Sequence, residues 1–124
     1  MTWSAQEVDE RLERAMARQD EALDNLLNLG VLKDQTERAY EEAKRNAITS
    51  GQVSGRNEAE RRARLLAVQV RPGKTILDLR YERERAKTGY FDARRVIDKL
   101  EKDIDVLQTL HVTHRNASST GTRR

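Results

Sequence analysis

The chain has 124 residues, of which 36% are charged and 36% belong to the hydrophobic set, and its 24 basic and 21 acidic side chains give a net charge of +3. It contains no cysteine, which excludes disulfide-stapled scaffolds and thiolate metal sites. No apolar run approaches the ~20 residues of a membrane span, and the first ten residues lack the pattern of a secretory signal, so we expect a charged, mostly helical, cytoplasmic chain.

The charge is divided unevenly along the chain. Residues 1–50 carry 7 basic and 11 acidic side chains, a net charge of −4, whereas residues 51–124 carry 17 basic and 10 acidic ones, a net charge of +7. Two such halves can pair within one molecule, with an acidic helix beside a basic one. The basic excess also favours a surface for nucleic acid or another polyanion, so both interpretations are open.

The first predicted element is a helix over residues 5–49. Ser4 and Glu7 have the spacing of a capping box, and Trp3 and Val8 have that of a hydrophobic staple. Coiled-coil intervals of four and three then define a seam that consists of Val8, Leu12, Ala15, Gln19, Ala22, Leu26, Leu29, Lys33, Thr36, Tyr40, Ala43 and Ala47. This spacing predicts one long helix with a single contact face.

A turn over residues 50–57 ends this helix. Gly51 can end it in the left-handed conformation, and Asn57 can cap the next helix, with Glu60 three positions on. We predict that this second helix covers residues 58–71 and that its seam begins with Ala59, Ala63 and Leu66.

The dipeptide Pro72-Gly73 interrupts the second arm near residues 71–75, because the residue before a proline avoids the helical conformation. Thr75 can cap a third helix over 75–113, whose seam consists of Ile76, Leu79, Arg83, Ala86, Tyr90, Ala93, Ile97, Leu100, Ile104, Leu107 and His111. Residues 116–124 are polar and end in two arginines, so we expect a disordered basic tail.

These elements predict an all-α fold: a long, antiparallel, coiled-coil-like helical hairpin that forms a single domain over residues 1–115, with the second arm kinked or broken near 71–75. When the turn is centred near Val53, residues at equal distances from it along the two arms face each other, and seam residues lie opposite seam residues. The predicted pairs are Ala47 with Ala59, Ala43 with Ala63, Tyr40 with Leu66, Leu29 with Leu77, Ala15 with Tyr90 and Val8 with Ile97.

Two apolar regions exceed what this seam can bury. In the predicted pairing the end of the second arm overhangs the first, and the leucine-rich segment 23–32 is wider than one seam. Contiguous exposed apolar surface marks an interface. We therefore expect the hairpin to pack into an oligomeric bundle or to bind a protein partner, through Leu27, Leu32, Leu100, Ile104, Leu107 and Leu110.

Residues with catalytic potential are sparse. His111 and His114 have a spacing that metal sites use, but no Asp, Glu or Cys follows them. The serines lie away from any histidine base, and Gly51 to Gly55 lacks the Lys-Ser/Thr that follows in a phosphate loop. We therefore expect no catalytic, cofactor or metal site and no small-molecule substrate, and we interpret the chain as a non-enzymatic scaffold or protein-interaction module.

The alternative is a basic helical accessory to nucleic-acid transactions. Its contacts would be Arg61, Arg62, Arg64, Arg71 and Lys74, supplemented by the two C-terminal arginines. Carboxylates are interspersed among these cations, and aromatic residues are too few for a stacking platform on single strands. A further alternative is an inhibitor of a host protein.

The segment from Tyr40 to Val70 resembles small helical proteins encoded by tailed phages and prophages. The residues that carry the resemblance are Tyr40, Ala43, Ser50-Gly51, Gly55, Asn57, Arg61 and Ala63, which fit two helices flanking a short Gly-x-Asn turn. Pro72-Gly73 departs from that pattern. The resemblance implies a phage accessory protein in the host cytoplasm and carries over no functional residues.

Overall fold

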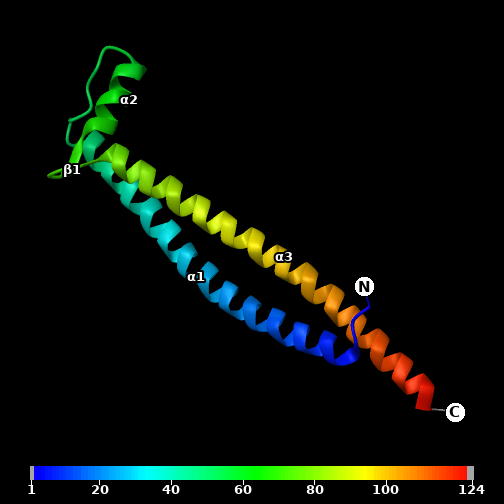
Figure 1. The fold of residues 1–124 in the computed structure, drawn as a ribbon. Coiled ribbons are helices and arrows are strands. Elements are labelled where there is room, and N and C mark those ends of the chain that lie inside the picture. Colours follow the sequence, from blue (N-terminus) through cyan, green and yellow to red (C-terminus); the bar gives the residue numbers. More distant parts are fainter. Residues whose placement is uncertain (1, 123–124) are drawn as a thin grey trace. The chain divides into compact units, whose positions relative to one another are not determined.

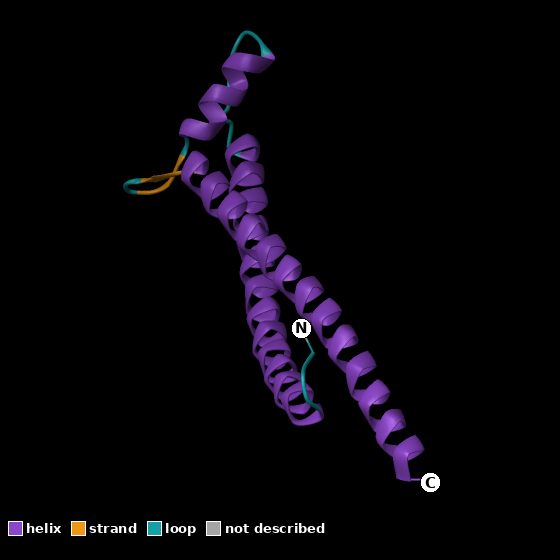
Figure 2. Cartoon of the chain, turned by 45° about the vertical axis from the view of Figure 1, so that its right-hand side comes forward, coloured by secondary structure: helices purple, strands orange, loops and turns teal. Residues whose placement is uncertain are grey.

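The computed structural model describes residues 2–122, with side chains through Ala117. Figure 1 follows the order of the elements in that range: α1 (Ala5–Thr49), α2 (Glu58–Ala67), β1 (Gln69–Arg71), β2 (Lys74–Thr75) and α3 (Ile76–Thr122). The two strands form a small hairpin between α2 and α3, and the rest is helix and loop (Figure 2). The predicted all-α helical hairpin is confirmed, with α1 and α3 as its long helices.

Each helix starts at a residue that the sequence marks as a cap. The Ser4 Oγ accepts a hydrogen bond from the backbone N–H three residues on, at 3.2 Å, and the Asn57 Oδ1 accepts the equivalent bond at 2.8 Å. At the start of α3 the cap is reciprocal: the Thr75 N–H donates to Asp78 Oδ2 at 2.9 Å, and the Asp78 N–H donates to Thr75 Oγ1 at 3.4 Å. These side chains satisfy N–H groups that a helix start leaves free.

The C-terminal end of α1 is closed by a left-handed glycine. Gly51 has a φ of +77°, and its N–H donates to the Ile48 carbonyl at 3.2 Å. The Gln52 N–H reaches back to the Ala47 carbonyl at 3.1 Å. This pair of bonds is the Schellman arrangement, which confirms the end predicted for the first helix.

The prediction of a helix over residues 58–71 is wrong beyond Ala67. Val68 is extended, and β1 pairs antiparallel with β2, with Gln69 opposite Thr75 and Arg71 opposite Lys74. Pro72-Gly73 forms the turn between them, and the φ of Gly73 is +79°. Proline and a left-handed glycine at the two central positions favour a type II turn. The predicted interruption near 71–75 is therefore confirmed as a break of the second arm, in which the dipeptide reverses the chain instead of kinking a helix.

The chain divides into two compact units. Unit 1 joins the chain up to Leu27 with the chain from Asp92 onward, and unit 2 is the continuous segment Asn28–Phe91. A single domain over residues 1–115 stays a prediction.

The core of unit 1 lies between the first turns of α1 and the later turns of α3. Val8, Ala15, Ile104 and Leu107 are buried together, and the partly buried residues packed on them are Trp3, Leu12 and Leu110. Trp3 thus packs on the cluster that contains Val8, as the predicted staple requires. The pairing of Val8 with Ile97 is wrong, because Val8 shares its cluster with Ile104 and Leu107 and not with Ile97.

The core of unit 2 gathers α1, α2 and α3. Its buried members are Tyr40, Ala47, Ile76 and Leu79, and the partly buried residues packed on them are Ala43, Val53, Leu65, Leu66 and Val68. Tyr40 and Leu66 share this cluster as predicted. Ala59 and Ala63 are exposed, however, so their predicted pairing with Ala47 and Ala43 is wrong. Helix α2 packs on this core through Leu65 and Leu66, whereas α3 forms the second arm of the hairpin.

Two glycines set close contacts between α1 and α3 in unit 2. A Cβ at Gly30 would lie 3.5 Å from the Tyr90 ring, and a Cβ at Gly89 would lie 3.9 Å from Leu29 Cδ2. The predicted pairs of Leu29 with Leu77 and of Ala15 with Tyr90 are therefore wrong. The true partners lie about two heptads, roughly 14 residues, further along α3.

The seam positions themselves are confirmed on both long helices. Every predicted seam residue of α1 is buried or half-buried. On α3, Arg83, Tyr90, Leu100 and His111 are half-buried, and the buried seam residues are Ile76, Leu79, Ala86, Ala93, Ile97, Ile104 and Leu107. The heptad pattern thus predicts which face each helix buries, although not the register between the helices.

The C-terminal helix is longer than predicted. Helix α3 continues to Thr122, so the predicted helix end at residue 113 and the disordered tail from residue 116 are wrong over this range. Residues 123 and 124, which carry the two terminal arginines of that tail, lie outside the described residues.

Two glycine-to-alanine substitutions in unit 2 are expected to have opposite effects. Gly73→Ala destabilises the hairpin by about 1–2 kcal/mol, because its φ of +79° penalises any Cβ. Gly30→Ala stabilises by up to about 1 kcal/mol, because alanine favours helix and its Cβ makes an ordinary contact with Tyr90. Urea unfolding followed by circular dichroism measures both, and equal effects of the same sign would contradict this backbone geometry.

Candidate interaction surfaces

An exposed apolar stripe runs along α1 in unit 1. It consists of Met16, Leu23 and Leu27, of which Leu27 is the most exposed at 70%. Intervals of seven and four residues place the three on one helix face, about 80° from the seam at 3.6 residues per turn. Leu27 was predicted as an interface residue. Met16 was missed, although its spacing from Leu23 and Leu27 is visible in the sequence.

The prediction that Leu100, Ile104, Leu107 and Leu110 form an uncovered apolar overhang is wrong. Ile104 and Leu107 are buried against α1 in unit 1, and Leu100 and Leu110 are half-buried. The cause is the register, since the shift of about two heptads brings the first turns of α1 over these side chains. These four residues therefore stabilise the chain itself and offer little free apolar surface.

Leu32, the other predicted interface residue of α1, is exposed in unit 2. It borders a groove of about 320 Å³ between α1 and α3, together with Leu29, Thr36, Ala86 and Gly89. Apolar side chains thus line an accessible surface in each unit.

The five predicted nucleic-acid contacts all lie in unit 2, on α2 and the β-hairpin. On α2, Arg62 and Arg64 pair with glutamates one turn earlier at 3.3 and 3.0 Å, and Arg61 Nη1 donates to a loop carbonyl at 3.2 Å. On the hairpin, Arg71 is exposed, and Lys74 Nζ lies 2.6 Å from a carboxylate oxygen of Glu82. Local carboxylates therefore offset much of the positive charge of these residues.

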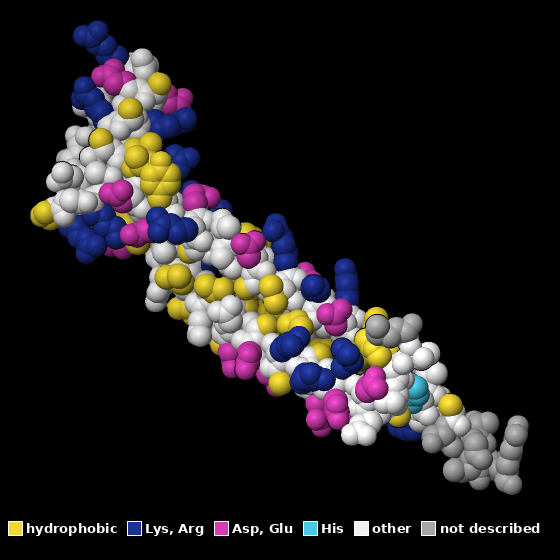
Figure 3. All heavy atoms as spheres, in the orientation of Figure 1, with side chains coloured by type: hydrophobic (Ala, Val, Ile, Leu, Met, Phe, Trp, Pro, Cys, Tyr) yellow, Lys and Arg dark blue, Asp and Glu magenta, His cyan; other side chains and the backbone are white. Residues whose placement is uncertain are grey.

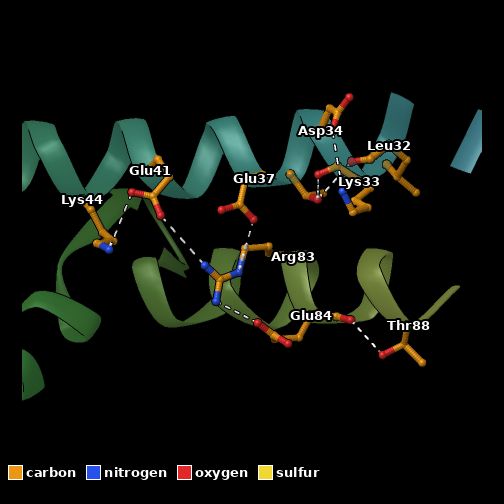
Figure 4. Close-up of polar contacts among 10 residues, drawn as sticks. Leu32, Lys33, Asp34, Glu37, Glu41, Lys44, Arg83, Glu84 and Thr88 are labelled. Carbon is orange, nitrogen blue, oxygen red and sulfur yellow. Dashed lines mark hydrogen bonds and ion pairs between the residues drawn. The ribbon is translucent and has the colours of Figure 1, made fainter. Parts of the chain in front are cut away.

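Arg83 occupies a seam position of α3 and joins it electrostatically to α1 (Figure 4). Its Nε lies 3.7 Å from Glu37 and its Nη1 lies 4.0 Å from Glu41, while its Nη2 bonds Glu84 at 2.8 Å. The guanidinium also lies 4.4 Å from the centroid of the Tyr40 ring, in cation–π geometry. Among the described residues, the ion pairs between the long helices involve only Arg83, and His111 adds a short polar contact with Asp9, so pairing of the acidic and basic halves is confined to these positions.

Burial alone would lower the pKa of Arg83, but the hydrogen bond with Glu84 and the charges of Glu37 and Glu84 raise it above its ordinary value. The same hydrogen bond, with the nearby cations, lowers the pKa of Glu84. Arg83 therefore stays charged within the seam. Its buried Nε has no hydrogen-bond partner among the described residues, because 3.7 Å is an ion-pair distance only.

The two histidines lie on α3 in unit 1. The His111 Nδ1 is 2.6 Å from an Asp9 carboxylate oxygen, and His114 is half-buried. Over the described part of the chain, no group of three or more His, Cys, Asp and Glu side chains is placed to hold a metal ion. Within residues 2–122, no helix combines the length and the apolar character that crossing a bilayer requires.

Comparison with known proteins returns no match to a family model, to a curated protein or to a solved structure. The resemblance to phage-encoded helical proteins therefore stays a prediction.

Proposed function

We propose that this chain is a non-enzymatic helical interaction module that associates with a second copy of itself through the apolar stripe of Met16, Leu23 and Leu27. The exposure of Leu27 carries the proposal, since its side chain stands 70% free on a helix whose seam is already filled by α3. Contiguous exposed apolar side chains of this kind usually mark an interface.

The arrangement of α1 supports this proposal. The seam of α1 holds small or polar residues such as Ala15, Gln19 and Ala22, so intramolecular packing buries little bulk there. Acidic residues flank the stripe at Asp20 and Asp24, and polar flanks around an apolar centre are the usual anatomy of an interface.

Self-association is tested by sedimentation equilibrium on the wild type and on Leu27→Gln. Burial of a leucine side chain contributes about 1.5–3 kcal/mol, so the substitution is expected to weaken association by about 10–100-fold. Val96→Gln is the matched control, because Val96 is a comparably exposed apolar residue on α3, and it is expected to leave association unchanged. A wild type that stays monomeric at tens of micromolar, or equal effects of the two variants, would contradict the proposal.

The two alternatives do not require self-association. An inhibitor of a host protein would use the stripe to bind that protein, so the chain alone would sediment as a monomer. A nucleic-acid accessory would bind through Arg61, Arg62, Arg64, Arg71 and Lys74, and it has less support because three of these cations already pair with glutamates of unit 2.

A further inference from the structure

A second surface of unit 1 is a groove of about 360 Å³ between α1 and α3. Its cationic wall comes from Arg11, Arg14 and Arg18 of α1. The intervals of three and four residues place these arginines on one helix face, about 80° from the seam and on the side opposite the apolar stripe. Figure 3 shows Lys and Arg side chains gathered beside apolar ones over the start of α1.

None of these three arginines forms an ion pair with a carboxylate of the described residues, although Asp103 of α3 also lines the groove. The Arg11 guanidinium lies 4.3 Å from the centroid of the Trp3 ring, and Arg14 Nε donates a long bond of 3.4 Å to a backbone carbonyl of its own helix. Arg18 makes no hydrogen bond or ion pair with the described part of the chain. Three guanidinium groups are therefore available to bind an anionic partner bidentately.

The rest of the groove is mostly apolar. Leu100, Leu107 and the exposed Val106 of α3 line it, and Ala15 lines it from α1. Trp3 also lines the groove.

We propose that this groove binds an acidic amphipathic segment of a partner protein. Carboxylates spaced at three and four residues over about two turns of a helix would pair with the arginines of α1, while the apolar side chains of the same segment would cover Leu100 and Val106. This binding is independent of self-association, because the arginines and the apolar stripe occupy different faces of α1.

A peptide fits the groove better than a nucleic acid does. Asp103 lies in the lining and would repel a continuous phosphate backbone, whereas a peptide can place an apolar or polar side chain there. The apolar floor contributes to the binding of leucine or valine side chains and contributes nothing to that of phosphates. Trp3 is the only aromatic residue of the lining, which is too few for a stacking platform.

The probe is a synthetic helical peptide of Glu, Leu and Ala with carboxylates at i, i+3 and i+7, compared with a scrambled peptide of the same composition. Trp3 is the single tryptophan of the sequence, so its fluorescence reports occupancy of the groove directly. We expect the patterned peptide to shift the Trp3 emission and to bind at least about tenfold more tightly than the scrambled one.

The variant that removes the cationic wall is the triple change Arg11→Gln, Arg14→Gln and Arg18→Gln, which keeps residues of good helix propensity. It is expected to weaken binding of the patterned peptide by about tenfold or more. Its matched control has the same loss of charge on α2: Arg61→Gln, Arg62→Gln and Arg64→Gln, which is expected to leave binding unchanged. Circular dichroism verifies that both variants keep the helical content of the wild type.

Several outcomes would overturn the inference. Equal affinity for the patterned and scrambled peptides, or equal loss in the two triple variants, would show non-specific charge attraction. Binding of a short single-stranded oligonucleotide that shifts Trp3 emission, in place of the peptide, would assign the groove to nucleic acid. A Trp3 shift that depends on protein concentration and is lost in Leu27→Gln would assign it to a second copy.

Discussion

Replacing Tyr40 by alanine is expected to destabilise unit 2 by about 3–5 kcal/mol. The Tyr40 side chain is 6% exposed at the centre of the cluster that joins α1 to α3. Its ring also lies beneath two cations, with the Arg83 guanidinium at 4.4 Å and Lys44 Nζ at 5.0 Å. The substitution therefore opens a cavity and removes the surface on which a charged seam residue rests.

Tyr40→Phe is the control, because it keeps the ring and the described residues give the hydroxyl no hydrogen bond. Its effect is expected to stay below about 1 kcal/mol. Circular dichroism reports all helices, whereas Trp3 fluorescence reports unit 1 alone. In Tyr40→Ala the circular dichroism transition is expected to begin at lower urea than the Trp3 transition. Alanine and phenylalanine variants of equal stability would show that Tyr40 does not stand in a core.

A cysteine pair at Leu29 and Gly89 is expected to crosslink almost completely within one molecule. A Cβ at Gly89 would lie 3.9 Å from Leu29 Cδ2, so a short bifunctional thiol reagent can bridge the two positions. The sequence has no cysteine, so the reaction has no background. The measurement is the fraction of faster-migrating monomer on a denaturing gel, at protein concentrations too low for crosslinks between molecules.

The control pair keeps the cysteine at Leu29 and moves the other to Leu77. Twelve residues of helix separate Leu77 from Gly89, which is about 18 Å at 1.5 Å per residue. A short reagent cannot span that distance, so little crosslinking is expected. Faster crosslinking of the Leu29–Leu77 pair would restore the pairing centred on residue 53 and would overturn the register described above.

The buried faces could be predicted from sequence because they depend on local periodicity. Intervals of four and three residues define one face of each helix whatever lies opposite, and Val8, Tyr40 and Ile76 are buried as that rule requires. The caps at Ser4 and Asn57 were equally predictable, since each depends on an oxygen and an N–H three residues away.

The register could not be predicted, because a heptad pattern repeats. A shift of about two heptads again sets apolar residues opposite apolar residues, so the two alignments look alike in sequence. The length of the connection between the long helices decides between the two alignments. The prediction of this connection is wrong at residues 68–75, which contain a β-hairpin. There Val68, Val70 and Thr75 flank Pro72-Gly73, a β-branched pattern with a turn signal that indicates a β-hairpin.

The predicted interaction surfaces differ from the observed ones because the predicted register between the helices is wrong. Correct pairing buries Ile104 and Leu107, which removes the predicted overhang from the surface, while Leu27 stays exposed. The groove with Arg11, Arg14 and Arg18 was not visible as a site, because its other wall is contributed by residues some 90 positions away. Its only sequence signal is the set of three arginines at helical intervals.

Gly30 and Gly89 have a consequence for how the long helices find their alignment. Gly30 faces the Tyr90 ring and Gly89 faces Leu29, and each position has room for a side chain about as small as a methyl group. Sliding α3 by one heptad would drive Tyr90 against a position of α1 that carries a much larger side chain, such as Glu37. An otherwise repetitive interface thereby favours one axial position over its heptad-shifted alternatives.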